Sequence, residues 1–164
     1  MRRLLIGAAT SALCFAVTAS AALGAKPEKT PIDETFFGVS NDICPFPVEI
    51  ASRQTGHQVA FTNNRGELTR VLVHVREQDV FTGPTGRTLS SDPYRFNLRV
   101  LFGADGEPEH VYATGIVLKV PLPGGESFHS AGRLDFVTRD ADFAITPDVG
   151  RSGDVAAFCA ALAG

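Results

Sequence analysis

The sequence predicts an all-β protein, an antiparallel barrel of about eight strands followed by a short C-terminal helix. Three observations support this fold class. Apolar residues recur at every second position in one segment after another, as they do in strands with one buried face. Short connections rich in Gly, Pro, Asn and Asp separate these segments, so we expect hairpins to join them in antiparallel order. Only the residues after 151 change to a helical spacing.

Two closures suit such a chain, a barrel and a two-layer sandwich. We favour the barrel because sequential strands without a long crossover close on themselves and leave no exposed edge. Glycines inside two of the expected strands, Gly115 and Gly132, suit the tight bends or bulges found at barrel corners.

The first 24 residues have the layout of a secretory signal peptide. Arg2 and Arg3 precede an apolar run that ends in small residues, so we expect cleavage after Ala21 or Gly24. An uncleaved anchor is the main alternative. No second run approaches the roughly 20 apolar residues that cross a bilayer, so we expect a secreted protein without membrane contact after cleavage. Loss of the two arginines moves the net charge from −3 to −5, which argues against a nucleic-acid partner.

Residues 25–42 are rich in charge and contain Pro27 and Pro31, so we expect a flexible leader there. Its Phe36–Phe37 pair is the part able to dock on the domain. Residues 43–164 are then expected to form a single β-barrel domain, because the roughly 140 residues left after cleavage are one domain's worth.

The cysteines predict one disulfide. Cys14 leaves with the signal peptide, and an even pair in an exported chain, Cys44 and Cys159, is expected to be oxidised. The bond would close a loop over nearly the whole mature domain, which in the chain-entropy model stabilises by roughly 4 to 5 kcal/mol. Free thiols, or a catalytic thiol with a histidine partner, are the competing interpretations.

Each expected strand is identified by the apolar side of its alternation. Turns are expected at Asn63–Gly66 and Asp105–Gly106, a loop at Pro121–Gly125, and a weaker strand at Arg87–Ser90. The expected inward-facing residues, strand by strand, are Phe46, Val48 and Ile50; Val59 and Phe61; Val71, Val73 and Val75; Tyr94, Phe96, Leu98, Val100 and Phe102; Tyr112, Ile116, Leu118 and Val120; Phe128, Leu134 and Phe136; and Phe143 and Ile145.

The C-terminal residues predict a helix with one apolar stripe. Ser152 can cap its first turn, and Val155, Phe158, Cys159 and Leu162 fall at the i, i+3, i+4 and i+7 positions. The disulfide is therefore expected to hold this helix against the start of the first strand.

No catalytic residue, metal site or cofactor is predicted. The four histidines, His57, His74, His110 and His129, lie on separate segments without the spacing of a zinc site. No nucleophile motif or phosphate-binding glycine loop is present.

The arginines at outward positions, Arg70, Arg76, Arg95 and Arg99, could form a basic stripe for an anionic partner. The ordinary interpretation is that they keep the outer face of the sheet solvated.

Aromatic residues at inward positions are the candidate ligand-binding residues. In an eight-stranded barrel they either fill the centre or line a small apolar cavity. The tyrosine hydroxyls would be the polar groups of such a cavity. The candidates are Tyr94, Phe96, Tyr112, Phe128 and Phe136.

The opening Cys44-Pro45-Phe46-Pro47-Val48, the Gly-bounded strands and the closing helix with its cysteine resemble a broad group of exported bacterial β-barrel proteins without assigned function. This resemblance is one of layout, and it implies a disulfide-tied β-barrel without naming an activity. The excess of arginine over lysine, 12 against 3, suits a GC-rich bacterial genome.

The leading hypothesis is a secreted monomer that binds a small apolar molecule or presents a surface to a protein partner, without catalysis. The first alternative is a barrel enzyme of the isomerase or cyclase kind. A buried His110 or Arg133 directed at Tyr112 would favour the enzyme, and four histidines on the outer surface would count against it. The second alternative is an interaction module or inhibitor that uses Phe36–Phe37 or the loop Pro121–Gly125.

Overall fold

The computed structural model describes residues 26–136 and 145–164. The predicted signal peptide (residues 1–24), the side chain of Ile116, and Phe143 of the last expected strand lie outside the described part.

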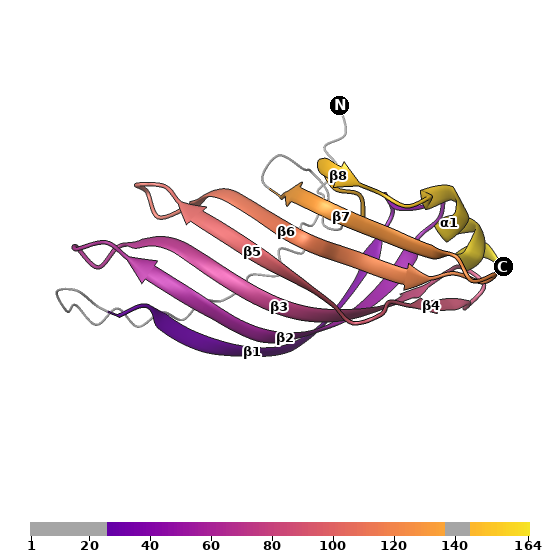
Figure 1. Ribbon diagram of the computed structural model, residues 1–164, viewed down its shortest axis with the longest axis horizontal. Helices are drawn as coiled ribbons and strands as arrows, with labels where there is room; N and C mark the ends of the chain where they lie inside the picture. The colour runs from indigo at the N-terminus through magenta and orange to yellow at the C-terminus, as the bar shows by residue number, and fades with distance from the viewer. Residues whose placement is uncertain (1–25, 137–144) are drawn as a thin grey trace, which may run out of the picture.

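The described residues form eight strands and one helix (Figure 1). The prediction of a mostly β protein with a short C-terminal helix is confirmed, and the weaker strand expected at Arg87–Ser90 is present as β4. In chain order the elements are β1 (Glu28–Ser40), β2 (Val48–Thr62), β3 (Leu68–Thr82), β4 (Thr88–Ser90), β5 (Tyr94–Phe102), β6 (Pro108–Pro121), β7 (Ser127–Asp135), β8 (Val149–Arg151) and α1 (Val155–Ala163).

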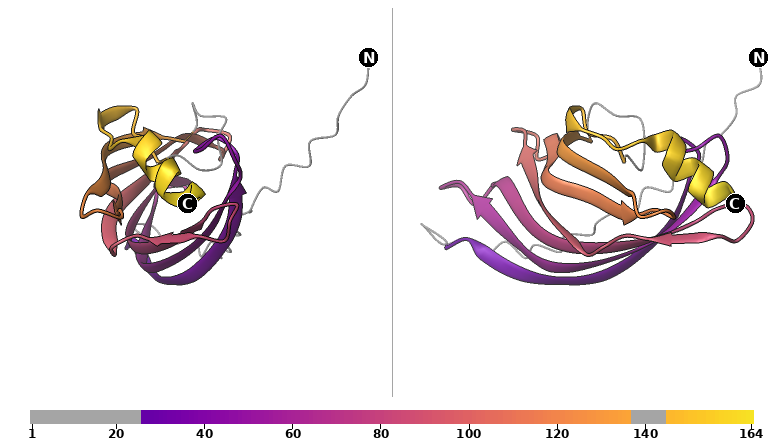
Figure 2. Two further views of the ribbon diagram at one scale, coloured as in Figure 1. Left: turned by 90° about the vertical axis from the view of Figure 1, so that its right-hand side faces the viewer. Right: turned by 45° about the vertical axis from the view of Figure 1, so that its right-hand side comes forward.

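The strands make one antiparallel sheet in the order β1-β2-β3-β5-β6-β7-β8, and β4 pairs with the end of β3. Within the described residues β1 and β8 do not pair, so the sheet is open and the predicted closure into a barrel is not observed. The sheet is nevertheless strongly curved, and α1 lies against its concave side at one end (Figure 2). We call the concave side the inner face and the convex side the outer face.

Among the described residues, four turns with the same hydrogen bond connect β2 to β3, β3 to β4, β5 to β6 and β6 to β7, at intervals of about 20 residues. In each turn the amide of the fourth residue, a glycine, donates to the carbonyl of the first, as Gly66 does to Asn63 and Gly106 does to Gly103. The glycine φ is +82° at Gly66 and +83° at Gly106, a left-handed conformation that costs a residue with a Cβ roughly 1 to 2 kcal/mol. The turns expected at Asn63–Gly66 and at Asp105–Gly106 are therefore confirmed.

The prediction of a flexible leader at residues 25–42 is wrong for the residues that form β1. This strand has 13 residues and pairs with β2 along its whole length, from Glu28 opposite Ala60 to Ser40 opposite Val48. Its charged residues do not prevent pairing, because most of them point to solvent from an edge strand, where Pro31 is also tolerated.

The two strands expected around Ile50 and Val59 are a single strand, β2. Its even-numbered residues face inward throughout, so Val59 and Phe61 lie on the outer face, not in the interior as predicted. The reason is that polar Ser52 and Gln54 occupy inner positions and hide the apolar alternation.

The inward parity of β6 changes at a bulge between Ile116 and Leu118, next to Gly115, whose φ is +110°. Ala113 faces inward before the bulge and Leu118 after it. Tyr112 consequently lies on the outer face, opposite Arg99, and its predicted place in the interior is wrong.

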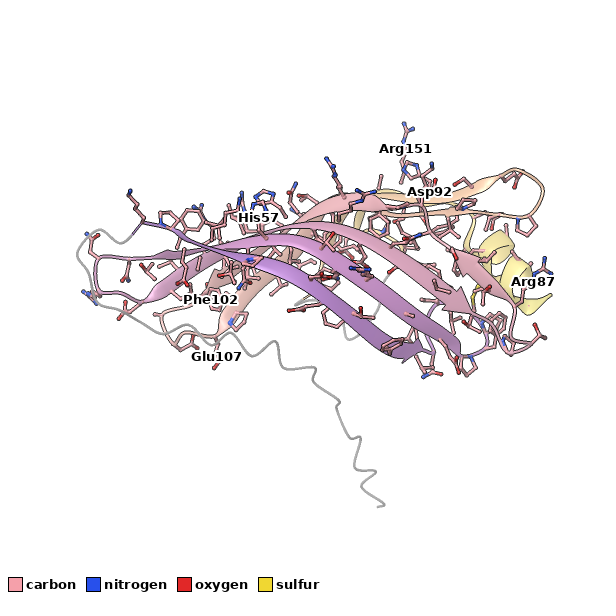
Figure 3. The ribbon with its side chains drawn as sticks, turned by 90° about the horizontal axis from the view of Figure 1, so that it is seen from below. His57, Arg87, Asp92, Phe102, Glu107 and Arg151 are labelled. Carbon is pink, nitrogen blue, oxygen red and sulfur yellow. A yellow bond between two sulfur atoms is a disulfide. The ribbon has the colours of Figure 1, made fainter. Side chains whose placement is uncertain are left out.

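Two groups of apolar side chains cover the inner face. The first lies under α1, where the rings of Phe81 and Phe128 are each 5.3 Å from that of Phe158. The second lies farther along the sheet, toward the end that carries Phe102 and Glu107 in Figure 3, whereas Arg87 marks the helix end. Its buried members are Val71, Val73, Val75 and Val100.

The helix has the predicted stripe, with Phe158, Cys159 and Leu162 buried. Its N-cap is Asp154, not the predicted Ser152: the Asp154 carboxylate accepts a 3.0 Å hydrogen bond from the amide of Ala157. The other end of α1 rests on the turn after β3, where a Cβ added to Gly83 would lie 2.2 Å from the Leu162 carbonyl oxygen.

Candidate functional site: an apolar groove beside the disulfide

The predicted disulfide joins Cys44, in the segment between β1 and β2, to Cys159 of α1. The two Cα atoms are 5.6 Å apart and the bond spans 115 residues of sequence. Ile43 and Cys44 are both buried, so the segment before β2 packs down onto the helix and does not project from it. The bond thus fixes the distance between a chain segment and the helix beside it.

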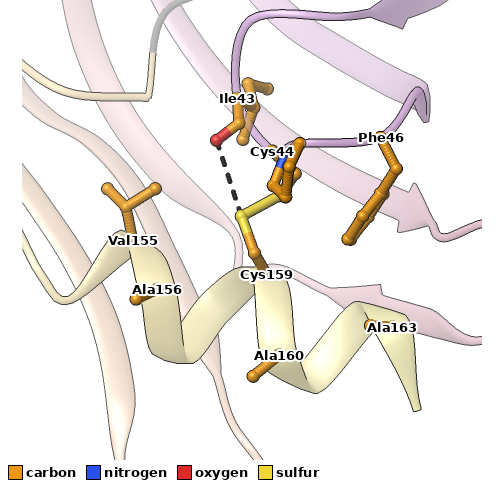
Figure 4. Close-up of a pocket in the computed structure, with 9 residues that line it drawn as sticks. Ile43, Cys44, Phe46, Val155, Ala156, Cys159, Ala160 and Ala163 are labelled. Atoms are coloured by element: carbon orange, nitrogen blue, oxygen red, sulfur yellow. Dashed lines mark hydrogen bonds between the residues drawn. A yellow bond between two sulfur atoms is a disulfide. The ribbon is translucent and has the colours of Figure 1, made fainter.

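A groove of about 610 Å³ runs between these two parts of the chain, with the disulfide in its wall (Figure 4). One side is the segment Ile43–Phe46, and the other is the side of α1 that carries Ala156, Ala160 and Ala163. Every lining residue is apolar, and the volume lies within the 300 to 1,000 Å³ typical of small-molecule sites.

The composition of α1 explains why this surface is apolar. The helix, VAAFCAALA, contains no polar side chain, and a helix that is apolar on all sides is normally buried. Here Ala156, Ala160 and Ala163 are nevertheless exposed. Their small side chains leave room beside the helix for an open groove with apolar walls.

A second unusual site, which we call the acid cluster, lies on the inner face of β2, β3 and β5. Glu77 and Asp79 continue the inward parity of the valines of β3, and Ser52 and Gln54 are their register partners on β2. Only 7% of Glu77 and 2% of Asp79 is exposed. The fifth member is Tyr94, at the start of β5, which pairs with Glu77.

Hydrogen bonds connect all five side chains of the acid cluster. The Tyr94 hydroxyl lies 2.7 Å from Asp79 Oδ2 and 2.9 Å from Glu77 Oε1. The Ser52 hydroxyl donates to Asp79 Oδ1 at 2.5 Å, and the Gln54 amide donates to Glu77 Oε2 at 2.6 Å. Since the tyrosine has one proton, it donates to one carboxylate at a time, and the other needs a proton of its own to complete the network.

The electrostatics of the acid cluster keep that proton on Glu77. Burial, together with the charge of Asp79, raises the pKa of Glu77 to about 8. Burial and the two neighbouring carboxylates also raise the pKa of Tyr94 above its usual range. At neutral pH Glu77 therefore keeps its proton and can donate to Tyr94, which donates to Asp79. The cluster is a closed, internally satisfied network.

The five aromatic candidates do not gather around one cavity. Tyr94 and Phe96 are in ring contact, with centroids 6.1 Å apart, and Phe128 packs against α1. Tyr112 lies on the outer face, where its hydroxyl accepts a 3.1 Å hydrogen bond from Arg99. Phe136 follows the end of β7, and its amide donates to the Val111 carbonyl.

All four histidines lie on the outer face or in exposed positions. His57 and His74 are cross-strand partners with ring centroids 4.9 Å apart, and His57 is labelled in Figure 3. Slight burial, together with Lys29 and His74, lowers the pKa of His57. His110 and His129 are exposed. Among the described residues no group of three or more His, Cys, Asp or Glu side chains is placed to hold a metal ion.

The outward arginines have individual contacts. The Arg70 guanidinium lies 4.1 Å from the centre of the Phe61 ring, and Arg99 bonds to Tyr112. Arg76 and Arg95 are direct cross-strand partners and both are exposed.

Comparison with known proteins gives no match: no family model, no curated protein and no solved structure matches this chain. In the part of the chain that the structure describes, no helix is both long and apolar enough to span a membrane.

Sequence reasoning missed both Glu77 and the exposed alanines of α1. The signal for Glu77 and Asp79 was present, because the alternation of Val71, Val73 and Val75 continues through them to the buried Phe81. The signal for the groove was the absence of any polar residue in the helix.

Proposed function

We propose that this protein is a secreted, non-catalytic binding protein that holds a small apolar molecule in the groove beside Cys44–Cys159. The observation that carries the proposal is a groove of about 610 Å³ lined by apolar residues alone, on a helix that exposes three alanines. Burial of apolar surface from both molecules supplies the affinity, at roughly 25 cal/mol per Å² before the costs of association.

The architecture of the groove suits a carrier. Its two sides come from distant parts of the chain and are joined by a covalent bond, so the site is held in shape before a ligand arrives. A preformed site avoids the free-energy cost of ordering its walls on binding. The N-terminal arginines followed by an apolar run, and the disulfide itself, support export of the chain.

The enzyme alternative has less support. The titratable groups of the acid cluster are already hydrogen-bonded to one another and are closed to solvent. Both His110 and Arg133 are exposed, so neither forms the buried pair with Tyr112 on which that alternative depended.

The test is binding of the fluorescent probe N-phenyl-1-naphthylamine to the purified mature protein. We expect saturable binding that Ala160→Glu weakens at least tenfold, because a carboxylate in the groove must be desolvated by the probe. The matched control is Val149→Glu, the same charge at an exposed apolar residue outside the groove. Equal binding by the Ala160→Glu variant and the wild type, or absence of saturable binding, would contradict the proposal.

A further inference from the structure

Three exposed apolar side chains gather on the outer face beside the free edge of β1. Phe37 is 81% exposed, Val39 57% and Val80 37%. Phe37, Ala51 and Val80 form one register row across β1, β2 and β3, and Val39 lies two residues farther along β1 on the same face. Large apolar side chains grouped in this way on a surface indicate an interaction site.

The edge of β1 next to this patch is open. One side of its 13 residues pairs with β2, and no described residue pairs with the other side. Long unpaired edges accept a further strand unless charge or proline protects them. Pro31, Asp33 and Glu34 protect the first half of β1, but the segment Thr35–Ser40 contains neither a charge nor a proline. The opposite border of the sheet, β8, has only three residues.

We propose that a second copy of this chain docks on this edge, so that two β1 strands pair antiparallel about a two-fold axis at Phe37. Such an interface is self-complementary, as a two-fold interface must be. The axis places the two Phe37 rings opposite each other on the same face, and each Thr35 opposite Val39 of the second copy. The register row Val80, Ala51 and Phe37 of one copy then meets Phe37, Ala51 and Val80 of the second copy, so that one row crosses six strands.

Charge excludes two other registers and is compatible with this one. The exposed Phe37 ring selects it, because only an axis at Phe37 pairs that ring with its own copy. With the axis at Phe37, Glu34 meets Ser40 of the second copy, and no like charges are opposed. An axis at Glu34 would oppose two glutamates, and an axis at Gly38 would place Glu34 opposite Asp42; like charges directly opposite each other destabilise a strand pair. An aromatic pair at the centre adds stabilisation beyond the area it buries.

The dimer differs from the monomer that the sequence predicts. A monomer agrees with a closed barrel, which has no edges, whereas the open sheet has a long edge on one side. The dimer interface is also separate from the groove, since neither Phe37 nor Val39 lines it. Dimerisation and binding of an apolar molecule can therefore be tested independently.

The experiment introduces a charge at position 37 and measures dimerisation of the mature protein by sedimentation equilibrium. We expect a wild-type dimer whose dissociation constant rises at least tenfold in Phe37→Lys and in Phe37→Glu, because each variant opposes two like charges. A 1:1 mixture of the two variants restores the dimer, because opposite charges then face each other. Val149→Lys, at an exposed position on β8, leaves the dimer unchanged.

A covalent trap checks the register. Phe37→Cys, on the axis, is expected to form an intermolecular disulfide under mild oxidation, whereas Thr35→Cys does not link to itself because it faces Val39. A wild-type protein that remains monomeric at 0.5 mM would overturn the proposal and leave a strand of a different protein as the occupant of the edge. A dimer that both charged variants retain, or a Thr35→Cys cross-link with none at Phe37→Cys, would also overturn it.

Discussion

Replacing Glu77 by glutamine is the most direct test of the acid cluster. Glutamine has nearly the shape of a protonated glutamic acid, and its amide can donate to Tyr94 as the protonated carboxyl does. The substitution therefore keeps the network of hydrogen bonds and removes only the ability to ionise. Any difference between the two proteins that depends on pH then reports the charge of Glu77.

The size and sign of the effect follow from the raised pKa. In the unfolded chain the carboxyl ionises near pH 4.5, and in the folded protein near pH 8. Between these values the folded state holds a proton that the unfolded state has lost, so the free energy of unfolding falls as pH rises. At about 1.4 kcal/mol per pH unit, the loss reaches about 5 kcal/mol at pH 8 and above, and is absent below pH 4.5.

The assay is urea denaturation of the wild type and of Glu77→Gln at pH 4.5, 6, 7 and 8.5. We expect the variant to gain stability relative to the wild type as pH rises through this window. Titration of groups outside the acid cluster affects both proteins equally and cancels in the difference. Glu49→Gln, on the exposed side of β2, is the matched control and should follow the wild type. Parallel stability curves for Glu77→Gln and the wild type would refute the assigned burial of an uncharged Glu77.

Two further variants test the elements that hold the sheet. Replacing Cys44 and Cys159 together by serine should lower the free energy of unfolding by up to about 5 kcal/mol, the chain-entropy value for a loop of 115 residues. Urea denaturation measures this loss, and an unchanged midpoint would contradict a stabilising role of the disulfide. Gly106→Ala should cost about 1 kcal/mol by the same assay, because a Cβ there meets no neighbour but the φ of +83° disfavours it; a variant as stable as the wild type would show that the turn has another conformation.

The sequence predicted the local pattern of the sheet well wherever one face is uniformly apolar. β5 is the clearest case: Tyr94 and Val100 are buried and Arg95 and Arg99 are exposed, as the alternation requires. The disulfide was also predictable, because only two cysteines remain after the expected signal peptide.

The errors arose where alternation is hidden or shifted. Ser52 and Gln54 are polar but face inward, because they donate hydrogen bonds to Asp79 and Glu77 there. The apolar alternation is interrupted at these two residues, so the sequence did not predict β2 as one strand. The bulge in β6 moves the inner parity by one residue, and no residue type marks that shift except Gly115. Closure of the sheet depends on whether its first and last strands meet, which a local pattern does not determine.

The groove could be predicted only in part: the all-apolar helix indicates an apolar surface, but not whether that surface is covered. Whether an apolar helix is covered on all sides depends on the path of the chain around it, and that path is set by the segment before β2. Ala160 is apolar but lies outside the predicted stripe, and it is a surface residue in the fold.

The disulfide also divides the described chain into a ring and an arm. Every strand from β2 to β8 lies between the two linked cysteines, so a single protease cut in any of those hairpins leaves one covalent molecule. β1 precedes Cys44 and lies outside the ring. The strand with the open edge is thus the one that a cut near residue 41 could release while the remaining sheet stays joined to its helix.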